Sequence, residues 1–188
     1  MRHVISALVI NEPGVLAHVA NMFSARGFNI DSLVVGRTED PQYSRMTIVV
    51  VADDNTLDQV RKQLAKLVPV VQVQDFQGAA FVERDLALIT IDAGPAQRSE
   101  VSHLTTLFGG KVVDVAPETV MIELTGGEEE MDRFIDLLKP YGIRELARTG
   151  VIAQPRGVQP TGAPVALPGS AKRLRSIDAP AAAALPPS

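Results

Sequence analysis

Residues 4–28 read VISALVINEPGVLAHVANMFSARGF, a strand pattern that runs directly into a helix pattern. The run from Val4 to Ile10 is apolar except for Ser6, which predicts a strand. Residues 11–14 end this run, and Pro13 favours a first helical turn because proline has no N–H to lose there. Gly27 is then typical of a helix end. The apolar residues of the predicted helix recur at helical spacing: Val15, Leu16, Val19, Ala20, Met22 and Phe23.

The chain as far as residue 76 adds two strands, a helix and a further strand. Strands are predicted over 28–37 and 45–51, and the polar loop between them is typical of a long hairpin. Residues 53–56 offer several helix N-caps, and Pro69 ends the helix that follows. The apolar stripe of that helix consists of Leu57, Val60, Leu64 and Leu67. Residues 70–76 alternate as a strand, which completes the order βαββαβ.

The second half of the chain repeats this order. Strands are predicted over 81–91, 111–115, 119–124 and 143–148, with one helix around 101–108 and another around 128–138. Each half has about 75 residues and the order of a ferredoxin-like fold. The sequence therefore predicts an α+β protein with two consecutive ferredoxin-like domains, 1–77 and 78–152. A single layer of helices leaves one sheet face or edge to be covered, so strands this rich in Val and Ile predict self-association.

The composition changes near Gly150. Seven of the 13 prolines fall among the last 38 residues, and no window there has a helix or strand period. Such a stretch cannot bury enough apolar surface to offset its conformational entropy, which predicts a disordered Pro- and Ala-rich tail over 153–188. We therefore expect a chain that ends at Val151 to fold normally. The basic residues 172–175 are either a docking spot for an acidic partner or, more simply, a solvated part of the tail.

Charge and composition exclude several classes of protein. The formal net charge is -4, which argues against a general binder of nucleic acid or of anionic membranes. Cysteine is absent, so there is no disulfide, no Cys nucleophile and no thiolate metal site. No signal-peptide pattern and no apolar run of about 20 residues is present, so we expect a cytoplasmic protein with no membrane partner.

The usual catalytic motifs are missing. The three histidines lie in three separate segments, and no nucleophile elbow or phosphate-binding glycine loop occurs. Residues 128–130 are three glutamates, but acidic residues in a first helical turn favour the helix dipole, which explains them without a metal. The sequence therefore predicts a binding or regulatory protein with no catalytic residue, no metal site and no cofactor of its own.

One stretch of the first half does suggest a ligand. A strand that ends in Asn11 and continues through Gly14 into a helix leaves the free N–H groups of Gly14, Val15 and Leu16 at a positive helix end, which suits a carboxylate. Gly14 leaves room for close approach to the backbone. The Asn11 side chain can donate and accept, so it can contact an amino or a carboxyl group. The alternative is an ordinary capped turn with Asn11 as the N-cap.

These same segments carry a family resemblance. Residues 11–16 (NEPGVL), 23–33 (FSARGFNIDSL) and 44–48 (SRMTI), after an acidic loop at 39–41, resemble the ACT domain. More narrowly, together with residues 81–86, 109–115 and 148–151, they resemble the regulatory small subunit of acetohydroxyacid synthase, also called acetolactate synthase. The resemblance extends from Met1 to about Ala153 and leaves out the tail.

The resemblance implies a specific role. Such a subunit has no synthase activity itself and activates a catalytic large subunit that uses thiamine diphosphate, Mg²⁺ and FAD in branched-chain amino-acid synthesis. It also confers feedback inhibition, typically by valine, with leucine and isoleucine as further candidates. The effector binds between the ACT domains of a homodimer. The resemblance implies that the effector contacts Asn11 and the helix start at Gly14 on one chain. It implies contacts with Asn29 and Ile30 on a strand of the other chain.

Two other functions share this fold class. One is a free-standing ACT-domain sensor of amino acids that acts on transcription or on another enzyme, although no helix-turn-helix segment is present. The other is a small hydrolase of the acylphosphatase type, which needs an arginine in the loop after the first strand. That loop is acidic here, at Glu12, and has no arginine.

Overall fold

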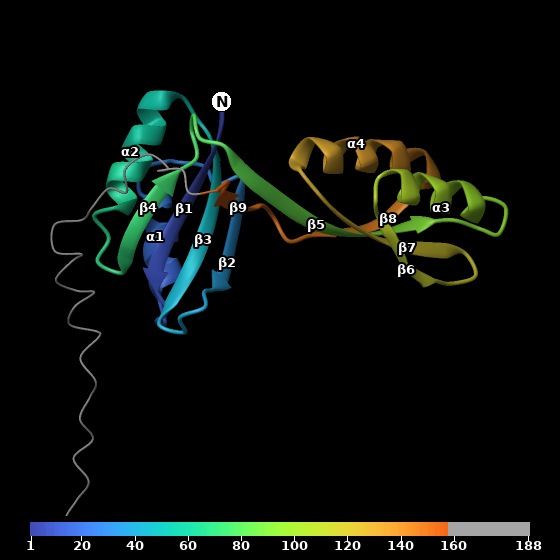
Figure 1. The fold of residues 1–188 in the computed structure, drawn as a ribbon, viewed down its shortest axis with the longest axis horizontal. Coiled ribbons are helices and arrows are strands. Elements are labelled where there is room, and N and C mark those ends of the chain that lie inside the picture. The colour runs from blue at the N-terminus through green and yellow to red at the C-terminus, as the bar shows by residue number, and fades with distance from the viewer. Residues whose placement is uncertain (158–188) are drawn as a thin grey trace, which may run out of the picture.

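The computed structural model describes residues 1–157, which form two α/β units joined by one long strand, β5 (Figure 1). The basic residues 172–175 and most of the predicted disordered tail lie outside the described residues.

The first unit is a four-stranded antiparallel sheet with two helices on one face. Its elements are β1 (Arg2–Ile10), α1 (Val15–Ser24), β2 (Ser32–Arg37), β3 (Tyr43–Val51), α2 (Asp54–Leu64) and β4 (Val70–Asp75). The strand order is β2-β3-β1-β4. Alternate residues of the central strands point toward the helices, since successive strand residues face opposite sides of a sheet. Ile5, Ala7 and Val9 from β1 therefore pack against Val15, Val19 and Phe23 of α1 in one core.

The second unit repeats this arrangement. Its elements are β5 (Phe81–Asp92), α3 (Arg98–Leu107), β6 (Lys111–Val115), β7 (Thr119–Gly126), α4 (Glu128–Leu138), a short 3₁₀ turn η1 (Lys139–Tyr141) and β8 (Ile143–Arg148). The order β6-β7-β5-β8 is equivalent to that of the first sheet. A separate core forms where Ile89 and Ile122 meet Phe134. The prediction of two consecutive ferredoxin-like α+β units is confirmed.

The second strand of the first sheet is shorter than the sequence predicts. β2 begins at Ser32, and Phe28 and Ile30 lie before it as partly buried residues packed on the first core. The strand pattern of the sequence includes residues 28–31 because two of them are apolar, but this segment is the connection between α1 and β2. The prediction that Asn29 and Ile30 belong to a strand is therefore wrong.

A short strand follows the second unit and returns to the first. β9 (Ile152–Pro155) pairs antiparallel with the first four residues of β5. This β5–β9 ribbon covers part of the sheet face that carries no helices, where Val151 and Ala153 pack against Val4, Val49 and Phe76. The prediction of disorder from residue 153 is wrong for residues 153–155, which belong to β9. Contacts with a strand distant in sequence order these residues, and they show no local period.

The ribbon changes the expected effect of truncation. A chain that ends at Val151 loses β9 and exposes the apolar residues beneath it. We expect its free energy of unfolding to be about 2 kcal/mol lower, because a buried apolar side chain stabilises the fold by roughly that amount. A chain that ends at Gly157 keeps every contact described and should have the same melting temperature as the full chain. Thermal unfolding of the two truncated chains checks this. Equal melting temperatures would show that the ribbon contributes nothing.

A buried carboxylate fixes the point where the chain leaves the second unit. The Asp85 side chain is 1% exposed, and its Oδ2 accepts from Arg148 Nε at 2.7 Å. Its Oδ1 accepts from Thr149 Oγ1 and from the Gly150 N–H, both at 3.1 Å. The next amide, Val151 N, lies 3.4 Å from Ser32 Oγ on β2. Asp85 therefore holds the segment that leads into β9.

A second polar contact joins the two units. Arg2 on β1 pairs with Glu83 on β5, at 3.0 Å, and with Glu128 at the start of α4. Burial raises the pKa of the Glu128 carboxyl, and the neighbouring Arg2 acts against that rise. The two units are thus linked by ion pairs as well as by the ribbon.

Candidate functional site

The turn that leads into α1 is shaped by Gly14. Gly14 is the N-cap residue, with φ 85° in the left-handed region, and no side chain caps the helix. The alternative of an ordinary turn capped by Asn11 is therefore wrong. No atom other than those of its own chain neighbours lies within 4 Å of the position that a Gly14 Cβ would take. The backbone at Gly14 is thus open to a ligand.

The amide groups at this helix end are largely free. The His18 N–H donates to Gly14 O at 3.0 Å, while the Val15 N–H reaches only Glu12 O at 3.4 Å. Within residues 1–157, the N–H groups of Gly14 and Leu16 donate to no protein acceptor. Free amides together with the helix dipole favour an anion such as a carboxylate. The structure thus provides the donors on which the sequence-based hypothesis rests.

Asn11 has a structural role beside its predicted one. Its Nδ2 donates to Pro41 O at 3.0 Å, and its Oδ1 accepts from Ser44 Oγ at 3.1 Å. Its backbone N–H donates to Gln42 O at 2.7 Å. These bonds fasten the turn to the β2–β3 connection and to the start of β3. Because a primary amide has two donor and two acceptor positions, one of each remains for a ligand at this exposed residue.

The other predicted residues contribute unequally. The side chain of Val15 is buried in the first core, so only its backbone faces the turn. Leu16 is 47% exposed beside it. Asn29 is exposed, and Ile30 is half-buried in the connection before β2.

Within one chain, Asn29 and Ile30 lie far from Asn11. The Asp31 N–H, one residue after Ile30, donates to Val49 O, whereas Asn11 follows Ile10, the partner of Tyr43. Tyr43 and Val49 are six residues apart on β3, a separation of about 20 Å along a strand. One chain therefore does not bring the predicted residues together, and a complete site would need a second copy.

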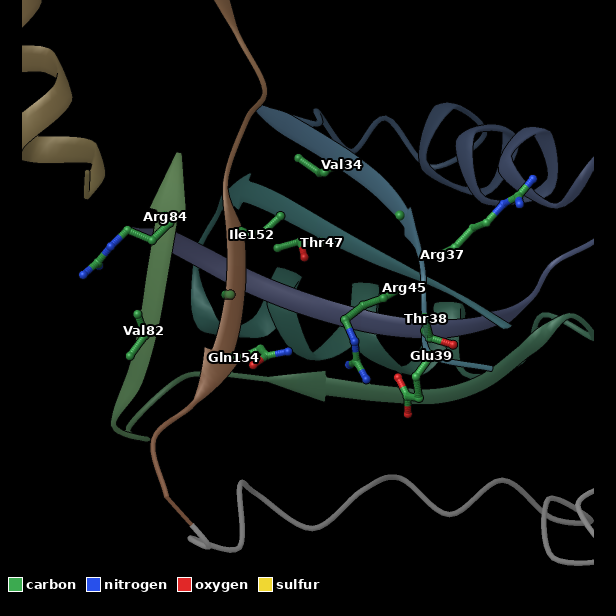
Figure 2. A pocket seen from close by; sticks show the side chains of 12 residues that line it. Val34, Arg37, Thr38, Glu39, Arg45, Thr47, Val82, Arg84, Ile152 and Gln154 are labelled. Atoms are coloured by element: carbon green, nitrogen blue, oxygen red, sulfur yellow. The ribbon is translucent and has the colours of Figure 1, made fainter. Parts of the chain in front are cut away.

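A cavity that the sequence does not predict lies on the other face of the same sheet. It has a volume of about 410 Å³ and lies between the β2–β3 part of the sheet and the β5–β9 ribbon (Figure 2). Its lining comes from segments more than a hundred residues apart, so no local motif reveals it. The lining includes Val34, Glu39, Arg45, Thr47, Ile152 and Gln154.

Within residues 1–157, no three His, Asp or Glu side chains are grouped so that they could hold a metal ion. None of the helices described is both long and apolar enough to cross a membrane.

Two family models match nearly all of the described chain. Residues 5–72 match the acetohydroxyacid synthase small subunit-like ACT domain, and residues 84–157 match the small subunit of acetolactate synthase.

Individual relatives give the same result. The chain is 50% identical over 157 residues to a probable acetolactate synthase small subunit of Archaeoglobus fulgidus, which covers 84% of this chain and 98% of that one. It is 46% identical over 161 residues to the acetolactate synthase small subunit of Mycolicibacterium smegmatis, which covers 86% and 95%. The crystal structure of the small subunit from Thermotoga maritima is 42% identical and superposes with a TM-score of 0.78 over 85% of this chain and 99% of that chain. The chain belongs to the family of acetolactate synthase small subunits, with an ACT domain as its first unit.

Proposed function

We propose that this chain activates an acetolactate synthase catalytic subunit and makes that subunit sensitive to a branched-chain amino acid, valine in the first place. The observation that carries the proposal is the open helix end at Gly14, where free amide groups and a positive φ leave the backbone accessible to a carboxylate. The relatives named above are small subunits of that enzyme, which supports the assignment of the partner.

The effector site requires a homodimer. In this proposal the helix end of one chain binds the carboxylate of the effector, and the free donor and acceptor of Asn11 contact its polar groups. Asn29 and Ile30 come from the second copy, and Ile30 provides an apolar contact for the branched side chain. A two-fold axis brings opposite ends of equivalent strands together, so it can join residues about 20 Å apart within one chain. The exposed edge strand β2 is suited to pair with its own copy.

Regulation then follows from differential binding. The regulatory dimer stabilises an active arrangement of the catalytic subunit, and the effector favours a second arrangement that activates less. An effector shifts this balance only by the difference in its affinity for the two arrangements. We assign the thiamine diphosphate, Mg²⁺ and FAD chemistry to the catalytic subunit and place the assembly in the cytoplasm.

The proposed partnership has a direct test. We expect the purified chain to form no acetolactate from pyruvate and to co-purify with the catalytic subunit encoded by the same organism. The assay is acetolactate formation by the chain alone, with the co-purified complex as the positive control. Turnover by the chain alone would contradict a purely regulatory role, and failure to co-purify would favour a free-standing amino-acid sensor.

A further inference from the structure

The cavity on the outer face of the first sheet holds two opposite charges that lack charged partners. Arg45 on β3 and Glu39 on the β2–β3 connection both line it, and Figure 2 shows the ends of their side chains directed to the same region. Among residues 1–157, neither takes part in an ion pair. Arg45 donates one N–H, from Nη1, to Ser6 Oγ at 2.9 Å, so four of its five N–H groups remain. A positive and a negative group are thus both available to one small ligand.

The hydroxyl of a largely buried threonine lines the same cavity. Thr47 is 3% exposed and lines the cavity from β3, opposite Ser6 on β1. Its hydroxyl makes no hydrogen bond with any residue that the structure describes. The hydroxyl oxygen is not fully enclosed by protein, so it can bond a ligand that enters the cavity. The Thr47 hydroxyl is a donor and acceptor that the protein itself does not use.

The remaining wall of the cavity is apolar. This wall is formed by Val34 from β2 and by Ile152 and Ala153 from β9. Gln154, also on β9, lines the cavity as well. Figure 2 shows the other two lining arginines, Arg37 and Arg84, extending away from Arg45 and Glu39. The Nη1 of Arg84 is already bonded to Glu83 O at 2.7 Å. The cavity thus has a positive and a negative group on one side and an apolar wall on the other. It suits a small ligand that carries both charges and an apolar part.

We propose that this cavity binds a free α-amino acid with a small apolar side chain, at a site separate from the Gly14 helix end. Arg45 pairs with the carboxylate, Glu39 pairs with the ammonium group, and the Thr47 hydroxyl bonds one of them. The side chain of the ligand lies against Val34 and Ile152. The volume of about 410 Å³ is within the range of small-molecule sites. A purely anionic ligand fits less well, because Glu39 would repel it.

The test is equilibrium dialysis of the full chain with labelled L-valine, with the melting temperature of every variant measured alongside. We expect two classes of valine site in the wild-type chain. Arg45→Met and Glu39→Gln should each weaken one class at least tenfold, and Thr47→Val should weaken the same class severalfold. Glu39 lies on an exposed connection, so Glu39→Gln is expected to keep the fold. Arg133→Met, which removes an exposed arginine of α4, is the matched control and should change neither class.

The ligand class is tested with two competitors. Isovalerate lacks the ammonium group, so it should compete at the cavity at least tenfold more weakly than valine. Inorganic pyrophosphate should not compete. If either probe binds as tightly as valine and is lost with Arg45→Met, the cavity is an anion site and the proposal is wrong.

The two sites can fail separately. If Gly14→Asp alone removes all bound valine, or if Arg45→Met and Glu39→Gln leave binding unchanged, the cavity is not an amino-acid site and the proposed function stands. If Arg45→Met removes all bound valine while Gly14→Asp changes nothing, the cavity site stands and the Gly14 effector site is wrong.

Discussion

Gly14→Asp is expected to abolish feedback inhibition of the reconstituted synthase while leaving its activation intact. The new carboxylate would lie about 4 Å from the carboxylate of the bound effector. At an effective dielectric constant of about 20, like charges at that distance repel by about 4 kcal/mol. This corresponds to roughly a thousandfold loss of affinity. The new side chain would also fill the open space over the Gly14 backbone.

Gly14→Asn is the matched control for this change. Gly14 has φ 85°, and any L-residue there is strained, by about 1–2 kcal/mol, with Asn and Asp among the residues that tolerate it best. Asn and Asp have nearly the same shape, so both variants should lose similar stability. Only Asp adds a charge, so the difference in effector affinity between the two variants isolates the electrostatic effect.

The measurement is titration of the reconstituted enzyme with valine, leucine and isoleucine, together with melting of each variant. Inhibition that persists unchanged in Gly14→Asp with any of the three effectors would rule out this helix end as its binding site. Equal loss of inhibition in both variants would show that the added side chain or the altered backbone at Gly14, and not charge, is responsible.

Arg148→Met is expected to destabilise the fold by about 3–5 kcal/mol, because it removes the cation paired with a buried carboxylate. The Asp85 side chain is 1% exposed, whereas that of Arg148 is 30% exposed. The bonds that Asp85 keeps, from Thr149 and Gly150, come from uncharged donors. The melting temperature should therefore fall by about 10 °C, given a fall of about 2–4 °C for each kcal/mol in a protein of this size.

Arg133→Met is the control for this loss. It makes the same chemical change on α4, where Arg133 Nε donates to the backbone carbonyl of Glu129 at 3.2 Å and the side chain has no ion pair within residues 1–157. Surface changes of this kind usually stay within about 0.5 kcal/mol. Equal melting of the two variants would show that the Asp85–Arg148 pair does not stabilise the junction. If Asp85→Asn in the Arg148→Met background restores stability, the penalty is confirmed as that of an unpaired buried charge.

The spacing of apolar residues predicts most of this fold, because each helix or strand buries the apolar residues of its own segment. The apolar run of β1 and the helical spacing from Val15 to Phe23 survive in the structure because Ile5, Ala7 and Val9 form one core with the buried face of α1. Errors occur where burial depends on distant segments. Phe28 and Ile30 are apolar yet lie in a connection, and β9 is ordered by Phe81–Arg84, some seventy residues earlier in the chain.

In the candidate site, too, local features are predictable from the sequence and contacts between distant segments are not. The free helix end at Gly14 is predictable from local sequence, because a strand, a Pro-Gly turn and a helix follow one another directly. The bonds of Asn11 to Pro41 and Ser44 are not predictable in this way, since they need the β2–β3 connection in place. The cavity around Arg45 and Thr47 needs both units and β9, so it is visible only in three dimensions.

The central claim is tested most directly by titrating this chain into its catalytic subunit at a fixed pyruvate concentration and measuring the rate of acetolactate formation. The account predicts that the rate rises with added chain, saturates at a defined ratio of the two subunits, and then falls when valine is added. A rate that stays at the level of the catalytic subunit alone, at every ratio, would contradict it.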